Sequence, residues 1–186
     1  RFALEAWIPG NESPEATLNN GVQHASFMFG DLNGDGTDEL VMGRLFAVTD
    51  PALEAVSLDG SLETLWGPVQ DLESPPGTPQ PLALAEVDSM SGMDVVLISA
   101  TGAVDARSGV SGTRLPNFPV FLGLGEQLAS GEEGAGQPLR AIVSLDVDGD
   151  GFDEAVVGGA DGYVYALNVA VEEAPTPTLL WSWFGG

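Results

Sequence analysis

Short apolar runs alternate with polar positions along most of the chain. The run YVYALN at residues 163–168 places successive side chains with a period of two residues, which is the spacing of a β-strand. No stretch shows a convincing helical period of 3.6 residues. The pattern therefore predicts an all-β protein.

Three segments of this pattern resemble one another. Each has an alternating apolar stretch, a short polar loop and a second apolar run of Leu, Val or Ile. The segments are SFMFGDLNGDGTDELVMG (26–43), LALAEVDSMSGMDVVLIS (82–99) and AIVSLDVDGDGFDEAVVG (141–158). Their loops begin at Asp31, Glu86 and Asp146, so the repeat spacings are 55 and 60 residues. Such self-similarity indicates one recurring structural unit.

Each segment is followed by an apolar strand, a turn and an aromatic-bearing strand, so one unit reads as four short strands. Pro- and Gly-rich stretches at 74–81 and 123–138 separate the units. We expect units at residues 21–75, 76–135 and 136–186. Four-stranded sheets repeated every roughly 40–60 residues are typical of β-propeller blades, and about three such blades are predicted.

Residues 1–20 are predicted to hold the outer strand of a preceding blade and a linker, because LEAWIPG (4–10) resembles LLWSWFGG (179–186). Closed propellers typically contain about four to eight blades. Three blades would form a partial propeller, completed by other segments or by other chains. The chain begins at Arg1 rather than Met, which suits a processed form or a piece of something longer. The alternative fold is a β-sandwich of about a dozen strands.

Two of the three loops carry acidic and amide side chains in the same order, DLNGDGTDE from residue 31 and DVDGDGFDE from residue 146. Calcium takes six to eight oxygen ligands, which alternate residues of a tight turn supply. Gly36 and Gly151, at position 6, permit the bend that turns the next carbonyl toward an ion. The predicted ligands at positions 1, 3, 5, 7 and 9 are Asp31, Asn33, Asp35, Thr37 and Glu39 in the first loop and Asp146, Asp148, Asp150, Phe152 and Glu154 in the third. Two calcium ions are predicted.

The same spacing opens an EF-hand, but an EF-hand needs a bidentate Glu at position 12, where this chain has Met42 and Val157. The flanks also predict strands rather than helices, so each ion would be held within one nine-residue hairpin loop. Magnesium fits less well because it demands octahedral geometry and retains water. A turn without an ion is the remaining alternative, since Asp, Asn and Gly favour turns.

The middle loop, EVDSMSGMD from residue 86, departs from this pattern. It keeps acids at Glu86, Asp88 and Asp94 but has Met90 at position 5 and moves the glycine to Gly92. We predict no ion in this loop.

The charge balance narrows the partners. The chain has 28 acidic and 5 basic residues, for a net charge of −23. Such a field repels nucleic acid and anionic membranes and attracts cations. Cysteine is absent, which excludes disulfides and thiol chemistry. No apolar run reaches the ~20 residues needed to cross a bilayer. We expect no nucleic-acid partner and no membrane insertion.

The loop motifs and the run LDVDGDGFDEAVVGGADGYVYALN resemble FG-GAP repeats, the calcium-bearing propeller blades of integrin α-subunits and many surface proteins. DGYVYALN and LPNFPV (115–120) also resemble pyrroloquinoline-quinone-type propeller repeats. The likeness covers nearly the whole chain after residue 20, and it implies calcium at loop positions 1, 3, 5, 7 and 9. Position 9 is Glu here rather than the commoner Asp, and the middle repeat is degenerate.

These observations predict a calcium-stabilised module, secreted or on the cell surface, that binds a protein or glycan partner in adhesion. One alternative is a structural subunit of an extracellular assembly, a homo-oligomer joined by strand or blade completion. Another is an enzyme on a propeller scaffold. We predict no enzyme, because the only histidine, His24, has no serine in a recognisable nucleophile turn, although paired carboxylates for glycoside hydrolysis stay open.

Overall fold

The computed structural model describes residues 4–6, 16–18, 23–45, 52–59, 62–69, 81–98, 102–122, 128–129, 139–159, 162–170 and 177–185. Within these ranges β-strands are the regular secondary structure and no helix is present. Consequently none of the described segments is a helix long and apolar enough to span a membrane. The predicted all-β class is confirmed.

Two of the sheets contain four antiparallel strands in chain order. The first sheet consists of β3 (Gln23–Gly30), β4 (Glu39–Leu45), β5 (Ala52–Ser57) and β6 (Thr64–Val69). The third consists of β12 (Leu139–Leu145), β13 (Glu154–Gly159), β14 (Tyr163–Asn168) and β15 (Thr178–Phe184).

The second sheet lies between these two and adds a short fifth strand. It consists of β7 (Leu82–Ala85), β8 (Asp94–Ile98), β9 (Ala103–Arg107), β10 (Val120–Leu122) and β11 (Leu128–Ala129). A separate antiparallel pair is formed by β1 (Leu4–Ala6) and β2 (Ala16–Leu18).

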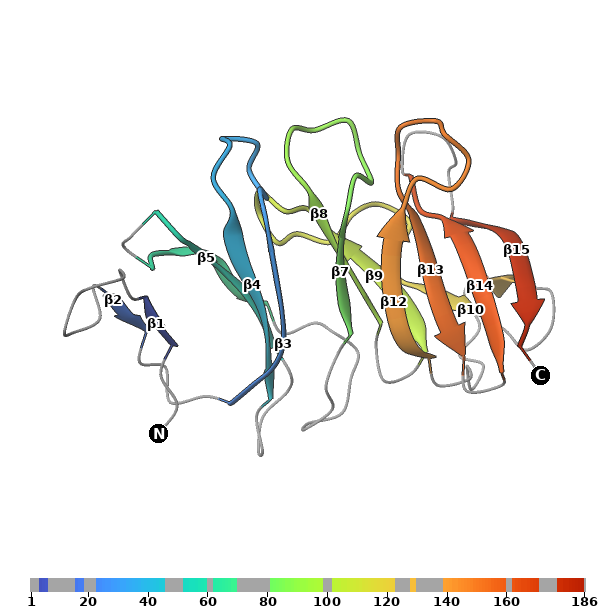
Figure 1. Ribbon diagram of the computed structural model, residues 1–186, viewed down its shortest axis with the longest axis horizontal. Coiled ribbons are helices and arrows are strands. Elements are labelled where there is room, and N and C mark those ends of the chain that lie inside the picture. The colour runs from blue at the N-terminus through green and yellow to red at the C-terminus, as the bar shows by residue number, and fades with distance from the viewer. Residues whose placement is uncertain are drawn as a thin grey trace.

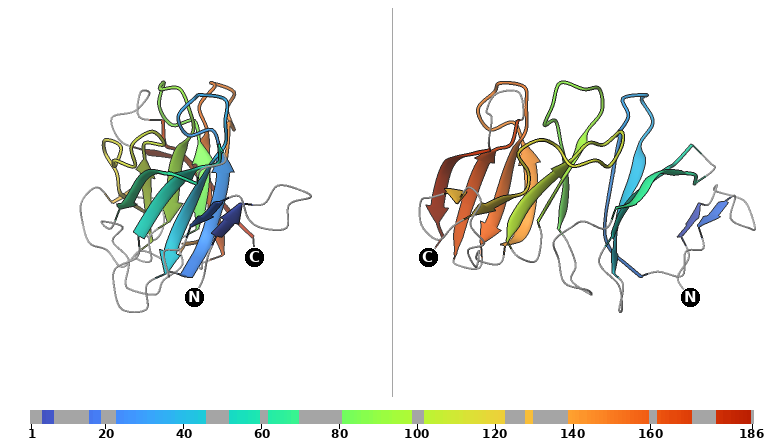
Figure 2. Two further views of the ribbon diagram at one scale, coloured as in Figure 1. Left: turned by 90° about the vertical axis from the view of Figure 1, so that its left-hand side faces the viewer. Right: turned by 180° about the vertical axis from the view of Figure 1, so that it is seen from behind.

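The three larger sheets stand side by side in an open row (Figure 1). Seen from behind, the same order runs in reverse, with β1 and β2 beside the first sheet (Figure 2). A sandwich is built from two packed sheets, whereas the described residues form three large sheets and one two-stranded pair. The first strands β3, β7 and β12 are neighbours across the sheets, and the Ser144 hydroxyl donates a hydrogen bond to the Leu84 carbonyl.

Two apolar clusters hold the row together. One lies between the first and second sheets and contains Val41, Trp66 and Leu97. The other lies between the second and third sheets and contains Val96 and Val157. Because successive side chains of a strand point to opposite faces, β7 and β8 of the middle sheet each contribute to both clusters.

The packing follows one register in all three sheets. We call the face of a sheet that points toward the next sheet along the chain its C-side face, and the opposite face its N-side face. On the C-side face, a valine of the second strand is paired with an alanine of the third. The pairs are Val41 with Ala55, Val96 with Ala106, and Val156 with Ala166.

Trp66 locks the first sheet to the second. It extends from the C-side face of β6, is 7% exposed, and donates from Nε1 to the Gly109 carbonyl at 2.5 Å. Its ring lies over Gly112, where an added Cβ would meet Trp66 Cε3 at 2.6 Å. The turn from Ser108 to Gly112 is therefore a socket for the indole ring.

A buried ion-pair network supports this socket. Asp105 and Arg107 are each 1% exposed and are bridged by an Arg107 Nη2 to Asp105 Oδ2 contact of 3.0 Å. Arg114 Nε donates to Asp105 Oδ1 at 3.0 Å, and Arg107 Nη1 donates to the Gly112 carbonyl at 3.3 Å. Charge-assisted hydrogen bonds of this kind hold a buried turn in one geometry.

We predict that Gly112→Ala destabilises the fold. The residue has a φ of +69°, and the methyl group would overlap the Trp66 ring. Overpacking costs about 1–3 kcal/mol, to which the left-handed backbone adds strain. Urea unfolding measures the loss. Gly158→Ala is the matched control, because an added Cβ there meets nothing within 4 Å; equal losses in both variants would contradict the socket.

Candidate metal centre

Three loops lie together at one edge of the row of sheets, at the top of Figure 1. Each joins the first and second strands of its sheet: residues 31–38 join β3 to β4, residues 86–93 join β7 to β8, and residues 146–153 join β12 to β13. The residues predicted as ligands belong to the first and third of these loops. The arrangement places both sets on the same edge of the molecule.

The first loop folds around the side chain of its first residue. Asp31 Oδ1 accepts the N–H of Gly34 at 2.7 Å, and Asp31 Oδ2 accepts the N–H of Gly36 at 2.9 Å. Asn33 Oδ1 accepts the N–H of Asp35 at 2.9 Å. Short Asp and Asn side chains favour such local bonds to the backbone, which explains their spacing.

The third loop has the same hydrogen-bond pattern. Asp146 accepts the N–H groups of Gly149 at 2.5 Å and Gly151 at 3.2 Å. Asp148 Oδ1 accepts from Asp150 N at 3.3 Å. At position 5, Asp150 accepts the N–H of Phe152 at 2.8 Å, as Asp35 accepts that of Thr37 at 2.8 Å in the first loop. The two loops therefore share one backbone shape.

The buried glutamate at position 9 of each loop accepts a hydrogen bond from the backbone at position 2. Glu39 is 1% exposed and its Oε2 accepts the N–H of Leu32 at 2.9 Å. Glu154 is 0% exposed and its Oε2 accepts the N–H of Val147 at 2.8 Å. Both are the first residues of the second strand. A buried carboxylate thus reaches under each loop.

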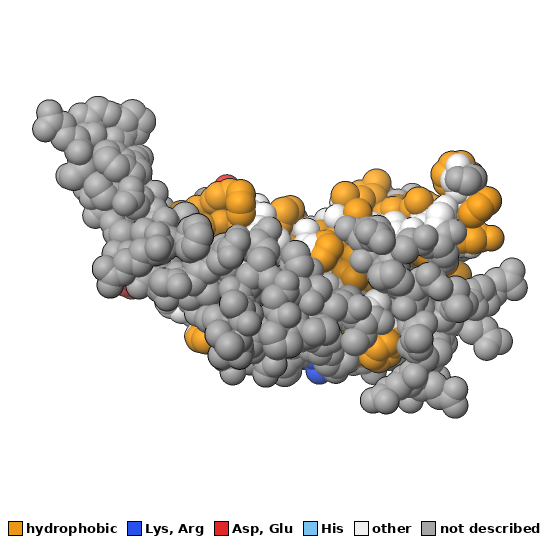
Figure 3. All heavy atoms as spheres, turned by 90° about the horizontal axis from the view of Figure 1, so that it is seen from below, with side chains coloured by type: hydrophobic (Ala, Val, Ile, Leu, Met, Phe, Trp, Pro, Cys, Tyr) orange, Lys and Arg blue, Asp and Glu red, His pale blue; other side chains and the backbone are white. Residues whose placement is uncertain are grey.

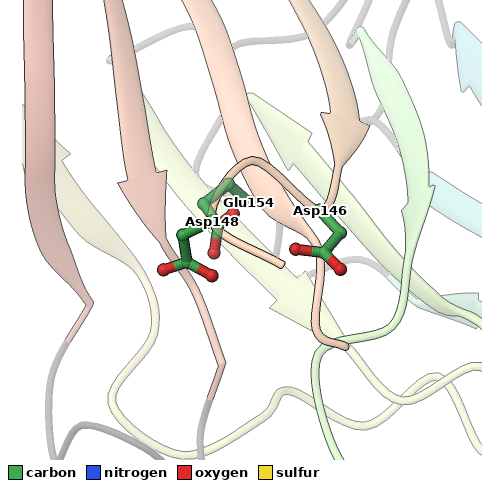
Figure 4. A group of neighbouring side chains, drawn as sticks. All are labelled: Asp146, Asp148 and Glu154. Atoms are coloured by element: carbon green, nitrogen blue, oxygen red, sulfur yellow. The ribbon is translucent and has the colours of Figure 1, made fainter. Parts of the chain in front are cut away.

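The third loop gathers three acidic side chains. Ligand oxygens of Asp146, Asp148 and Glu154 all lie within 4.8 Å of one another. Figure 4 shows Asp148 and Glu154 close together, with Asp146 facing them across the loop. The Oε1 of Glu154 is buried and has no hydrogen-bond partner. Because burying an unpaired carboxylate oxygen is costly, this atom fits a hard cation at the centre of the group.

The first loop differs from the third in the side chain at position 3. Asn33 stands where the third loop has Asp148, and its Nδ2 donates to Glu39 Oε1 at 3.4 Å. The amide therefore partners the oxygen that has none in the third loop. The first loop keeps Asp31, Asn33, Asp35 and Glu39 in equivalent positions, with one carboxylate fewer.

Burial raises the pKa of both glutamates. Desolvation is the largest cause for Glu39 and Glu154, and the neighbouring aspartates of each loop raise the pKa further by repulsion. The backbone N–H bonds from Leu32 and Val147 act in the opposite direction. A bound cation would relieve this repulsion.

The middle loop lacks such a group. Among the described residues, the third loop holds the only trio of acidic side chains close enough to share an ion. Met90 projects into solvent at 63% exposure, and its N–H is held by Asp88 Oδ1 at 2.7 Å. The absence of an ion here stays a prediction.

Asp94 takes the place of the buried glutamate in the middle loop. It is 4% exposed, its Oδ1 accepts the N–H of Gly109 at 3.1 Å, and its Oδ2 has no partner. Burial, followed by repulsion from Asp88, raises its pKa to about 6. The bond to Gly109 also connects this loop to the turn that receives Trp66.

Hydrogen bonds join the three loops to one another. Met93 donates its N–H to the Asp31 carbonyl at 2.8 Å, which links the first and middle loops. Asp153 donates its N–H to the Glu86 carbonyl at 2.9 Å and accepts the Glu86 N–H at Oδ2 at 3.0 Å, which links the middle and third loops. Sequence reasoning assigned no role to Asp153. Its recurrence as Asp38 in the first loop was the available signal.

The structure does not test the predictions for His24 or for the carbonyl groups at position 7 of the loops. The side chain of His24 lies outside them. The carbonyl groups of Thr37 and Phe152 stay predicted ligands, and the structure places their N–H groups on Asp35 and Asp150. Comparison with known proteins found no protein-family model that matches the chain and no curated protein that matches it.

We predict that Asp94 makes the fold less stable as the pH rises. The pKa of its carboxyl group is about 6 in the folded chain against an ordinary value of 3.8, so the native state binds the proton more tightly and stability falls between about pH 4 and pH 6. This shift corresponds to at most about 2–3 kcal/mol. Asp94→Asn removes it, so the stability of the variant relative to the parent should increase from pH 4 to pH 7 in urea unfolding. An equal difference at both pH values would contradict the assignment.

Proposed function

We propose that the chain is a calcium-stabilised β-propeller module of a secreted or cell-surface protein, with an ion in each of the first and third loops. The observation that carries the metal proposal is the partnerless Oε1 of Glu154, buried beside Asp146 and Asp148. The donor set consists of oxygen atoms, which calcium and magnesium prefer. Calcium suits this irregular set of carboxylates and carbonyls better, because magnesium demands near-ideal octahedral geometry.

The proposal of a second ion rests on the matching loop. The first loop makes the same backbone bonds to positions 1, 3, 5 and 9 as the third. Asn33 offers an amide oxygen in place of a carboxylate, and amide oxygens are also calcium ligands. With one negative charge fewer, this site should bind more weakly than the third.

The proposal of propeller blades rests on the repetition of the packing. Each of the three sheets places its first strand beside the first strand of its neighbour and presents equivalent residues to it. Adjacent four-stranded sheets that bury their faces against one another in sequence order are typical of propeller blades. The FG-GAP resemblance of the loop sequences supports the same architecture.

The proposed role is adhesion through a protein or glycan partner. Calcium loops of modest affinity suit the millimolar calcium outside cells, and the loops that the ions would hold lie together at one edge (Figure 1). The net charge of −23 favours a partner with basic or neutral recognition groups. If the proposal is correct, binding to immobilised surface proteins or glycans falls when a chelator removes calcium. Binding and melting that are both unchanged by chelation would contradict it.

We predict that Asp150→Ala and Asp35→Ala each lower the melting temperature in calcium and remove most of the calcium dependence of their own site. An ion that binds only the folded chain stabilises it by about 3 kcal/mol at a hundredfold excess over Kd, which corresponds to roughly 5–10 °C for a chain of this size. Thermal unfolding with calcium and with chelator measures the effect. Glu63→Ala is the matched control, because it removes an exposed acid outside the loops; a control that behaves like the loop variants would refute specific sites.

We predict that Asp148→Asn makes the third loop behave like the first. The new amide can donate to the partnerless Oε1 of Glu154, as Asn33 does to Glu39. The variant should therefore melt at a higher temperature than the parent in chelator, and gain less from added calcium. A loss of stability in chelator would show that this oxygen is satisfied in another way.

A further inference from the structure

The internal packing of the sheets identifies which side chains a neighbouring sheet must cover. In the first strands, register pairing makes Met28, Ala83 and Val143 equivalent, because each is paired with the C-side valine of its sheet. Met28 packs into the cluster between the first two sheets, and Ala83 is 3% exposed within the cluster between the last two. Val143 is 56% exposed. The C-side face of the third sheet is open at this strand.

The fourth strands show the same contrast. Trp66 and Trp181 are equivalent, because each is paired with the C-side alanine of its sheet, Ala55 or Ala166. Trp66 is 7% exposed in the socket of the second sheet, whereas Trp181 is 41% exposed. Trp183, on the same face, is 61% exposed. Figure 3 shows hydrophobic side chains at the right-hand end of the molecule, where the third sheet lies.

The N-side face of the first sheet is exposed at β3 in a complementary way. Leu82 and Ile142 are equivalent to Phe27, because each is paired with the N-side residue that follows the C-side valine or its equivalent in the second strand. These partners are Leu97, Val157 and Met42. Leu82 is 7% exposed and Ile142 is 8% exposed, because a preceding sheet covers each of them. Phe27 is 63% and Phe29 55% exposed, and their rings meet edge to face at 5.9 Å.

Among the side chains that the structure describes, no acid is exposed on the strands of either face. In the described strands, the acidic residues on these faces are Glu54 on the first sheet and Glu154 on the third, exposed by 2% and 0%. A chain of net charge −23 that leaves two exposed apolar faces free of exposed acids presents two surfaces suited to association.

We propose that these two faces pack against each other between copies of this chain. The C-side face of the third sheet (Val143, Trp181 and Trp183) covers Phe27 and Phe29 on the first sheet of a second copy. The contact repeats the one that the first sheet makes with the second inside the chain. It is heterologous, and such contacts close into rings when the rotation permits. Two copies make a ring of six large sheets, within the range of about four to eight for closed propellers.

The mass of the 186-residue chain in solution tests the proposal. Light scattering after size-exclusion chromatography should give about 38.4 kDa, twice the 19.2 kDa of one copy. The dimer should become tighter as salt rises, because the two copies are both strongly acidic and salt screens their repulsion. A mass of 19.2 kDa at all protein and salt concentrations would overturn the proposal.

Charge substitutions test which faces meet. Phe29→Glu and Trp183→Glu should each give a monomer, with circular dichroism and melting like the parent because both residues are exposed. Met90→Glu is the matched control, since Met90 is 63% exposed on a loop away from both faces; it should stay dimeric. A dimeric Phe29→Glu, or a monomeric Met90→Glu, would refute the proposed contact.

Mixing the two variants separates a head-to-tail contact from a symmetric one. The mixture keeps one intact contact, between the unaltered third sheet of the Phe29→Glu chain and the unaltered first sheet of the Trp183→Glu chain. It should therefore recover a species of dimer mass. A mixture that stays monomeric would overturn the head-to-tail arrangement. Because none of these residues is a proposed calcium ligand, a negative result leaves the calcium proposal standing.

Discussion

Each of the three sheets buries a carboxylate at the first residue of its second strand. Glu39, Asp94 and Glu154 are exposed by 1%, 4% and 0%, in a chain whose acids already outnumber its bases by 23. A buried carboxylate needs hydrogen bonds, a cation or a proton. The three loops differ in how they meet this need. In the outer loops the glutamate accepts a backbone N–H group and lies beside the side chains that we propose as ligands of a cation, while the middle loop has an aspartate that holds its proton more tightly than usual.

That constraint also explains how the sheets are joined. Asp94 accepts the N–H of Gly109, in the turn that receives Trp66 of the preceding sheet. The buried Asp105 and Arg107 pair supports the same turn. A polar network therefore lies beside an apolar cluster at the first sheet interface, and each fixes the geometry of the other. The small alanines on the third strands let the next sheet approach closely along the same face.

The sequence predicted the elements and the loops well, because both depend on local patterns. Alternating residues such as Tyr163 to Leu167 form a strand, and the order of Asp, Asn and Gly in the outer loops corresponds to bonds between residues two to five positions apart. The Trp66 socket and the bond between Met93 and Asp31 connect residues far apart in the chain. Nothing in the local sequence of Gly112 reveals that an indole ring covers it. Burial of Asp94 likewise depends on a turn that is 15 residues away.

The hydrogen bonds inside the outer loops fix the shape of each loop independently of cation binding. The side chains of Asp31 and Asp146 hold the N–H groups of their own loops at positions 4 and 6. Ordering a flexible segment costs roughly 1–2 kcal/mol per residue, and these hydrogen bonds meet that cost beforehand. A cation bound at the proposed sites would therefore meet a preorganised receptor, and less ordering of the loop would oppose its binding.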